Sequence, residues 1–281
     1  MNDVRVNGSL IDLSMPVVMG ILNVTPDSFF DGGRYVSINE MSQRIRKIID
    51  DGEAIIDVGA YSSRPGAVNI TEKEELNRLL PAIDCIKAIN PDFPISVDTF
   101  RASVVDAVVQ RFGCVIVNDI SGGNLDAEMF DVVASNKTPY ICMHMRGNPQ
   151  NKQDFTHYED LICEIIDYFS AKISLLRKKG VTDIICDPGF GFSKTVEQNF
   201  YLLQHMHEFK LLDVPILAGL SRKTMIWKTL NIAATEALNG TSVLNVIAIQ
   251  KGATILRVHD VREAVEIIKL LDKLGRTNVS G

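Results

Sequence analysis

The stretch ISVDTFRASVVDAVVQRFGCVIVND, from Ile95 to Asp119, contains two short apolar runs separated by a segment of helical length. The runs Ile95–Val97 and Val115–Val117 are rich in β-branched residues, which predicts strands. Neither run alternates apolar and polar residues, and this continuity is typical of parallel strands that helices cover. Each run stops at polar residues, Asp98 in the first and Asn118 in the second. The stretch therefore predicts a strand–helix–strand unit with polar side chains at the strand ends.

The same rhythm repeats along most of the chain. Eight apolar runs are predicted to be strands: Val17–Leu22, Ala54–Val58, Ile95–Val97, Val115–Val117, Pro139–Met143, Asp183–Cys186, Pro215–Ala218 and Thr254–Val258. Segments between them show helical spacing, as at residues 41–49, 76–83, 161–176 and 261–271. Eight strand–helix repeats within about 250 residues predict an α/β fold, the (β/α)₈ TIM barrel. The alternative is an open doubly wound sheet, which usually has fewer strands and a Gly-rich dinucleotide turn.

The N-terminal residues predict a small addition to the barrel. The segments Val4-Arg5-Val6 and Leu10-Ile11 flank Asn7-Gly8, a dipeptide that suits a tight hairpin turn. We expect residues 1–15 to form a hairpin that closes the barrel floor. Since no linker or composition break divides the chain, residues 1–281 are predicted to be one domain.

Composition limits the classes of partner. The 281 residues are 46% hydrophobic and carry a net charge of −6, so no global basic field points to nucleic acid or an anionic membrane. No apolar run reaches the length of about 18 residues needed for a membrane span, and the N-terminus lacks the apolar core of a signal peptide. The five cysteines are scattered and include no C-x-x-C pair, so neither a disulfide framework nor a zinc site is expected. We therefore expect a cytoplasmic protein.

Polar residues at the strand ends are the candidates for function. In a TIM barrel these ends converge on one rim, where active sites lie. Four residues at such ends are expected near the barrel axis: Asp98, Asn118, Asp187 and Lys223. A single Asp or Asn after a strand is more often a helix N-cap, and Ser221 could likewise cap a helix over residues 222–230. The convergence of the whole set is costly for folding and therefore points to a ligand.

The residue types indicate the ligand chemistry. Two carboxylates, an amide and a lysine suit a flat heterocycle whose edge carries several N–H donors and a carbonyl. A second group of strand-end residues suits a phosphate or diphosphate: Asn23, Arg64, Arg257 and His259. The side-chain oxygen of Asn23 could also bind Mg²⁺, which prefers oxygen ligands and retains waters.

Seven motifs resemble those of the dihydropteroate synthase family, between about residue 16 and residue 265. They are GILNVTPDSFFDGG, SSRPGA, SVDTF, VNDISGG, DPGFGFSK, GLSRK and RVHDV, in this order. The resemblance implies a (β/α)₈ barrel that joins 6-hydroxymethyl-7,8-dihydropterin diphosphate to p-aminobenzoate in folate biosynthesis. It further implies release of diphosphate, a requirement for Mg²⁺, a homodimer and inhibition by sulfonamides.

The resemblance also assigns roles to residues at the matching positions. Pterin binding is assigned to Asp98, Asn118, Met143, Asp187 and Lys223. Diphosphate binding is assigned to Asn23, Arg64, Arg257 and His259, with Asn23 as the metal ligand. The p-aminobenzoate site is assigned to Ser63, Arg64, Pro65, Phe192, Ser221 and Lys223. The catalytic residues are Arg64, Asp98, Lys223 and Arg257.

The chain departs from the family pattern at Tyr61. Many members have Gly-Glu-Ser-Thr-Arg-Pro where this chain has Ala-Tyr-Ser-Ser-Arg-Pro at residues 60–65. Ser63 keeps a hydroxyl at its position, whereas Tyr61 replaces a glutamate. This replacement removes any acidic role at that position and bears on the shape of the loop that follows.

The expected reaction is dissociative. An arylamine is a poor nucleophile, so we expect diphosphate to leave first and the amine to capture the resulting cation on the pterin. Residues 24–34 and 62–67 are predicted to fold over the site and exclude water. Two alternatives remain: a pterin-using methyltransferase, which would not need Arg64 or the Lys223–Ser221 pair, and a non-catalytic pterin-binding protein, which would need no covering loops.

Overall fold

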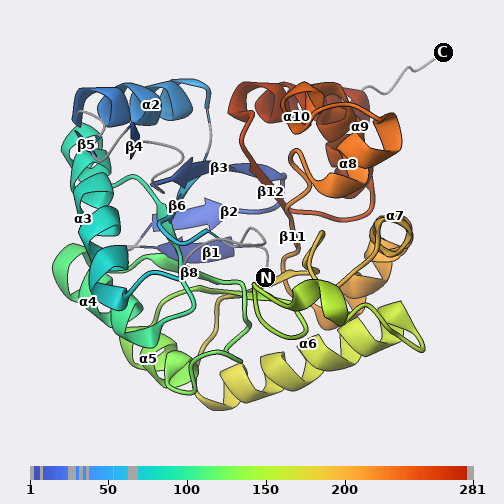
Figure 1. Cartoon of the computed structure of the whole chain (residues 1–281), viewed down its shortest axis with the longest axis horizontal. Coiled ribbons are helices and arrows are strands. Elements are labelled where there is room, and N and C mark those ends of the chain that lie inside the picture. Colours follow the sequence, from blue (N-terminus) through green and yellow to red (C-terminus); the bar gives the residue numbers. More distant parts are fainter. Residues whose placement is uncertain are drawn as a thin grey trace.

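The computed structural model describes residues 3–6, 9–24, 30–31, 34–35, 38–52, 54–62 and 69–276. Figure 1 looks nearly along the axis of a barrel, with the helices arranged as a ring around the strands. Among the described residues no helix is both long enough and apolar enough to cross a membrane.

Eight parallel strands form the barrel wall. Their bounds are β3 (Val17–Asn23), β6 (Ile55–Gly59), β7 (Ile95–Asp98), β8 (Ile116–Asp119), β9 (Tyr140–Met143), β10 (Ile184–Asp187), β11 (Leu217–Ala218) and β12 (Ile255–Val258). Each strand pairs with the next in this order except β10 with β11, and β12 pairs with β3. A parallel bridge between Cys186 and Ile216 joins β10 to the residue before β11 and closes the ring. The predicted TIM barrel is therefore confirmed, and the open-sheet alternative is wrong.

The strands are in register at their polar ends. Gly59 of β6 is level with Asn23 of β3 on one side and with Asp98 of β7 on the other. Asp98 is in turn level with Asn118 of β8. Because level residues on neighbouring parallel strands lie side by side, this register carries three polar strand ends to one rim.

The helices form the outer layer. Their bounds are α2 (Ile38–Asp50), α3 (Glu72–Ile89), α4 (Ala102–Phe112), α5 (Met129–Asn136), α6 (Leu161–Lys178), α7 (Val196–His205), α8 (Thr224–Leu230), α9 (Leu238–Gln250) and α10 (Val261–Arg276). Three short 3₁₀ segments lie among them: η1 (Lys152–Asp154), η2 (Met206–Leu212) and η3 (Ala234–Glu236). The helices alternate with the strands along the chain and pack against the outside of the sheet, as in other (β/α)₈ barrels.

Several helices begin at capping residues that the sequence supplies. The side chain of Thr71 accepts a hydrogen bond from the backbone N–H of Glu74, and α3 starts there. Asp160 caps α6 through the N–H groups of two residues in its first turn. Thr195 and Gln198 form a capping box at the start of α7. Each cap satisfies N–H groups that a helix start leaves without an intrahelical partner.

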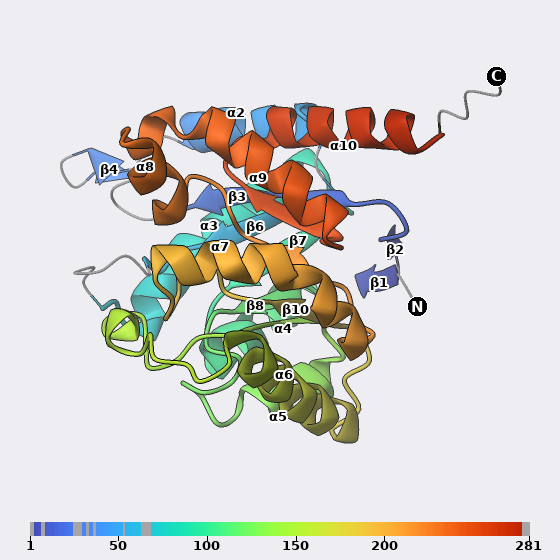
Figure 2. The ribbon, with the colours of Figure 1, turned by 90° about the vertical axis from the view of Figure 1, so that its right-hand side faces the viewer.

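One apolar layer lies outside the barrel wall and another lies inside it. The larger one lies between the barrel wall and the helices. The smaller one fills the lower barrel interior and contains Met19, Ile55, Ile116, Ile141, Ile185, Leu217 and Ile255. The antiparallel pair β1 (Asp3–Val6) and β2 (Ser9–Asp12) packs Val4, Val6 and Ile11 against this smaller layer. Figure 2 shows β1 and β2 at one end of the barrel and β4 at the opposite end.

The first predicted covering loop is described only in part. Phe30–Asp31 (β4) pairs antiparallel with Arg34–Tyr35 (β5). The remaining residues of 25–33, and residues 63–68 of the second predicted loop, lie outside the described residues. The prediction that both loops fold over the site therefore stays a prediction.

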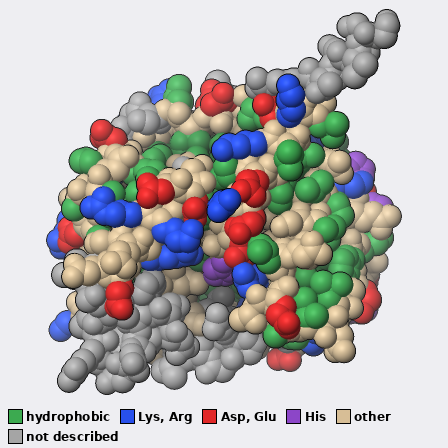
Figure 3. All heavy atoms as spheres, turned by 90° about the horizontal axis from the view of Figure 1, so that it is seen from above, with side chains coloured by type: hydrophobic (Ala, Val, Ile, Leu, Met, Phe, Trp, Pro, Cys, Tyr) green, Lys and Arg blue, Asp and Glu red, His purple; other side chains and the backbone are tan. Residues whose placement is uncertain are grey.

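The face over α2 and α10 carries charges of both signs. Figure 3 shows acidic and basic side chains interspersed there, with hydrophobic side chains gathered toward the side where α8 and α9 lie. Interspersed charges produce no single-sign field over this face, in keeping with the charge argument from composition.

Candidate active site

The barrel mouth contains a cluster of carboxylates around one arginine. Arg257 donates from Nε to Asp57 Oδ2 at 2.7 Å and from Nη2 to Asp98 Oδ2 at 2.8 Å. Asn118 donates from Nδ2 to the same Asp57 carboxylate, at 3.1 Å to Oδ2. Asp57 is fully buried, and the arginine supplies the positive charge that such a carboxylate needs. The cluster therefore brings together three residues that the sequence singled out: Asp98, Asn118 and Arg257.

Asp57 was missed by the sequence predictions. It lies inside the apolar run Ala54–Val58, whose pattern predicts a strand and no site residue. A charged residue within a buried parallel strand requires a charged or hydrogen-bonding partner, so the signal was present. Its partner, Arg257, lies 200 residues further along the chain, and only the closed barrel brings the two together.

The same cluster alters the acidity of Asp98. Burial raises its pKa to about 7, with Asp57 also raising it, while the charge of Arg257 opposes the shift. Two carboxylates that share one arginine cannot both be stabilised fully as anions. With its pKa raised in this way, the Asp98 carboxyl can accept or donate a hydrogen bond according to its proton.

Asn23 lies at the edge of this cluster. A Cβ at Gly59 would lie 3.3 Å from Asp98 Cβ and 3.6 Å from Asn23 Oδ1, so both side chains pass over the glycine. A larger residue at this position would press on Asp98 and contact Asn23. In the part of the chain that the structure describes, no group of three His, Cys, Asp or Glu residues could hold a metal ion.

Asp187 and Lys223 stand on the opposite side of the mouth. Asp187 Oδ1 accepts from the backbone N–H of Gly189 at 2.8 Å, and burial raises the pKa of this carboxyl. Lys223 Nζ donates to the carbonyl oxygen of Phe190 at 2.7 Å and lies 4.5 Å from the ring centroid of Phe192. Burial lowers the pKa of Lys223 to about 7, although the charge of Asp187 opposes this shift. The two groups are thus electrostatic partners that both contact the loop after β10.

A separate apolar cluster lies beside these polar groups. Ile120, Met143, Met145 and Phe192 pack together, with Phe100 against them. Lys152 Nζ lies 3.7 Å from the centroid of the Phe192 ring, and burial lowers the pKa of this lysine to about 8. The structure therefore brings Met143, assigned to the pterin, and Phe192, assigned to p-aminobenzoate, into one cluster, and it adds Lys152, for which the sequence carried no signal. Aromatic and thioether side chains at a mouth lined with hydrogen-bonding groups suit a flat aromatic ligand.

The side chain of Ser221 contacts the backbone of His259. The hydroxyl oxygen of Ser221 accepts from the backbone N–H of His259 at 3.2 Å. Burial and the charge of Arg257 lower the pKa of His259 to about 4, so its imidazole is neutral at pH 7. The capping alternative for Ser221 is wrong, because α8 begins at Thr224 with Lys223 as its N-cap residue. The hydroxyl instead ties the ends of β11 and β12 together.

Tyr61 joins two loops at the rim. Its hydroxyl donates to Asn69 Oδ1, and Gln150 Nε2 donates to the Tyr61 hydroxyl at 2.6 Å and to Asn69 Oδ1 at 2.8 Å. The Tyr61 ring packs edge-on against Phe100 with ring centroids 5.0 Å apart. The neighbouring predicted residues Ser63, Arg64 and Pro65 lie outside the described residues.

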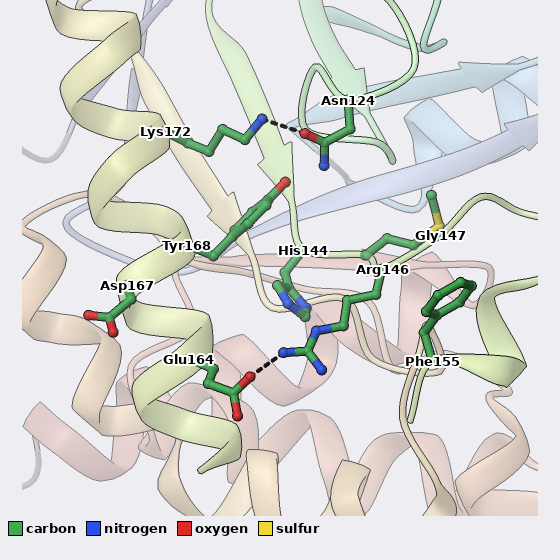
Figure 4. Close-up of a pocket in the computed structure, with 10 residues that line it drawn as sticks. Asn124, His144, Arg146, Gly147, Phe155, Glu164, Asp167, Tyr168 and Lys172 are labelled. Atoms are coloured by element: carbon green, nitrogen blue, oxygen red, sulfur yellow. Dashed lines mark hydrogen bonds and ion pairs between the residues drawn. The ribbon is translucent and has the colours of Figure 1, made fainter. Parts of the chain in front are cut away.

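A polar cavity of about 710 Å³ lies beside β9, apart from the mouth. Figure 4 shows it between α6 and the loop that carries His144, Arg146 and Gly147. Lys172 donates to Asn124 at 2.7 Å on one side, and Arg146 pairs with Glu164 on the other. The cavity contains none of the four predicted strand-end residues, so its size alone does not identify the site.

Comparison with known proteins identifies the same region of the chain. A family model described as "Pterin binding enzyme" matches residues 19–259. A protein of Synechocystis sp. named dihydropteroate synthase is 46% identical over 262 residues, which are 92% of this chain and 90% of that protein.

Two solved structures are similar over nearly their whole length. The Yersinia pestis dihydropteroate synthase in a sulfonamide drug complex has a TM-score of 0.90 and 36% identity, covering 98% of this chain and 100% of that one. The Xanthomonas albilineans dihydropteroate synthase with 4-aminobenzoic acid has a TM-score of 0.91 and 33% identity, covering 99% of both chains. The strand-end cluster lies in the part of the chain that these similarities cover.

Proposed function

The chain belongs to the dihydropteroate synthases of the pterin-binding enzyme family, and we propose that the barrel mouth around Arg257 is its active site. Enzymes of this kind join a dihydropterin diphosphate to p-aminobenzoate and release diphosphate, a step of folate biosynthesis. The observation that carries the location is the convergence of Asp57, Asp98 and Asn118 on one arginine at the strand ends. Such a buried polar cluster is costly unless a ligand uses it.

The polar side chains suit the pterin ring. Its amino and ring N–H groups are donors, and the carboxylates of Asp98 and Asp187 with the amide of Asn118 supply acceptors. Lys223 has three N–H donors and uses one on Phe190, which leaves donors for a ring carbonyl or nitrogen. Met143 offers an apolar contact for the ring face. We assign the pterin pocket to these residues.

The neighbouring groups suit p-aminobenzoate. The Phe192 ring provides an aromatic surface, and Lys223 and Lys152 bring positive charge within 4.5 Å and 3.7 Å of its centroid. A benzoate that packs on this ring would meet compensating charge for its carboxylate. Ser221 lies on the same rim, and Ser63, Arg64 and Pro65 are assigned to this site from their motif alone.

Mg²⁺ fits the donor set at the mouth. The amide oxygen of Asn23 is a neutral oxygen ligand beside Gly59, and Mg²⁺ is commonly held by one or two protein oxygens together with substrate phosphates and water. A diphosphate would complete the coordination that Asn23 begins. The ion, when bound, stabilises the negative charge of the departing diphosphate.

The chain's own residues favour a dissociative route. Cleavage of the bond between the exocyclic carbon and diphosphate leaves a cation on the pterin, and the carboxylates that face the ring stabilise this positive charge. Arg64 and Arg257 are assigned to the leaving group, with His259 as a neutral hydrogen-bonding partner. The amine nitrogen then forms the new bond to carbon and loses a proton.

The two alternatives make different predictions. A methyltransferase would consume no diphosphate ester, and a binding protein would release nothing. The test mixes the purified chain with the pterin diphosphate, p-aminobenzoate and Mg²⁺ and measures diphosphate release. Release that depends on p-aminobenzoate supports the synthase; pterin binding without release contradicts it.

A homodimer and a cytoplasmic location are also proposed. Tyr201, Leu230 and Val243 are exposed on α7, α8 and α9, which contact one another in sequence around the barrel. A second copy of the chain would remove this apolar surface from water. All five cysteines carry thiols rather than disulfides, which suits a reducing compartment. Sedimentation of the purified chain measures the oligomeric state.

A further inference from the structure

Lys194 is a buried lysine that the pterin and p-aminobenzoate sites do not use. Only 3% of the residue is exposed, and it follows directly after the loop that carries Asp187 and Phe192. Its Nζ lies 3.0 Å from His144 Nδ1, 3.1 Å from the carbonyl oxygen of Phe192 and 3.2 Å from that of Gly189. These three acceptors equal the three N–H donors of an ammonium group.

The position is costly for a charged group. None of its three hydrogen-bonding partners is a carboxylate, so hydrogen bonds to neutral acceptors must offset the lost hydration. A methionine or leucine would fill a similar volume without that cost. The lysine is therefore expected to perform a task that an apolar side chain cannot.

The loop that Lys194 holds contains one non-glycine residue, Ser193, in an unfavourable backbone conformation. Gly189 has φ of +72° and Ser193 has φ of +52°, both in the left-handed region. A Cβ at Gly189 would collide with the carbonyl oxygen of His144, so the loop lies directly against the end of β9. Ser193 adds a further anchor, since its Oγ donates to the carbonyl oxygen of Arg146 at 2.8 Å. A loop of this shape persists only when surrounding contacts determine it.

Two of the three acceptors are directly connected to groups at the mouth. The N–H of Gly189 donates to Asp187, and the carbonyl of the same residue accepts from Lys194. Phe192 accepts from Lys194 through its backbone while its ring packs with Met143. Displacement of either anchor would move one substrate-facing group.

We propose that Lys194 is a positioning residue, whose three hydrogen bonds to His144, Gly189 and Phe192 fix the loop that presents Asp187 and Phe192 to the substrates. The inference rests on the proposed function, because it takes that loop to face pterin and p-aminobenzoate. It adds a residue outside the pocket and assigns His144 a role. In this arrangement His144 Nδ1 would accept a hydrogen bond from Lys194, which requires a neutral imidazole with its proton on Nε2.

The kinetic test compares Lys194→Met with Lys172→Met in the full chain. Lys172 is the matched control, because it lies on α6 and donates to Asn124 beside the outer cavity. We expect Lys194→Met to raise KM for p-aminobenzoate about tenfold, with a smaller change in kcat, while the control stays within about twofold. Equal kinetics for both variants would overturn the proposal.

A second pair of variants guards against simple misfolding. His144→Asn keeps a side-chain oxygen that can accept from Lys194, whereas His144→Leu removes the acceptor. We expect His144→Leu to reproduce the KM effect of Lys194→Met and His144→Asn to recover most of the loss. If the two His144 variants have the same KM, the hydrogen bond does not position the loop.

A spectroscopic measurement separates this inference from the proposed function. At about pH 6, nitrogen NMR of the wild-type chain should show His144 Nδ1 without a proton and Nε2 protonated. A proton on Nδ1 would contradict the donated hydrogen bond even in a chain that releases diphosphate. A wild-type chain without diphosphate release would instead refute the function, and the NMR result would still decide the Lys194–His144 contact.

Discussion

The floor and the mouth of this barrel are built from the same strands and differ in almost every physical property. At the floor, Met19, Ile55 and Ile185 pack with the N-terminal hairpin in an apolar layer. At the mouth, a few residues along the same strands, Asp57 and Asp98 share Arg257. Burial of apolar side chains stabilises the floor, whereas burial of charged groups at the mouth carries a desolvation cost.

The largest expected effect comes from removing the positive charge of Arg257 at the mouth. Arg257→Met leaves Asp57 and Asp98 without their cation, and removal of one partner from a buried pair costs about 3–5 kcal/mol. We expect urea denaturation to show this loss and diphosphate release to disappear. The control is Arg262→Met, because its ion pair with Glu266 is exposed and is worth about 1 kcal/mol or less. Wild-type stability in Arg257→Met would show that the pair is not essential to the mouth.

A core substitution at the floor should lower stability without affecting the substrates. Ile185→Ala leaves a cavity in a fully buried layer and should cost about 2–5 kcal/mol, while KM for both substrates stays at the wild-type value. Denaturation and steady-state kinetics measure the two quantities. A change in KM without a loss of stability would refute the division between floor and mouth.

A smaller effect concerns pH. Burial raises the pKa of Asp98 from 3.8 to about 7, so the folded chain holds this proton more tightly than the unfolded chain. The contribution of Asp98 to stability is therefore present below about pH 4 and is lost as pH rises toward about 7. We expect Asp98→Asn to flatten the decline of stability across this range. Equal pH slopes for the variant and the wild type would contradict the assignment.

The smallest expected effect concerns Tyr61, the rim residue at which the chain differs from the family motif. Tyr61→Phe removes the hydroxyl that Asn69 and Gln150 share and keeps the ring contact with Phe100. We expect a change of about 1 kcal/mol or less in stability and a few-fold rise in KM for p-aminobenzoate. Tyr201→Phe on the exposed face of α7 is the control, and an identical result from both variants would show that the hydroxyl has no role at the rim.

Most strand-end residues were predictable because the fold places them by rule. Asp98 and Asp187 end their strands, and Asn118 is the next-to-last residue of its strand. Asp57 and Lys152 were not predicted, although both are buried beside these residues. A position inside an apolar run faces either the barrel interior or the helices, and the run looks the same in both cases.

The sequence by itself determined the repeated strand–helix order, the apolar strands and the polar residues that end them, because these follow from local periodicity and burial. Only the tertiary structure decided which polar side chains meet: Arg257 with Asp57 and Asp98, and Lys194 with His144. Partners that lie 50 to 200 residues apart become neighbours only when the strands assemble into the barrel, because local periodicity specifies elements and not the contacts between distant ones.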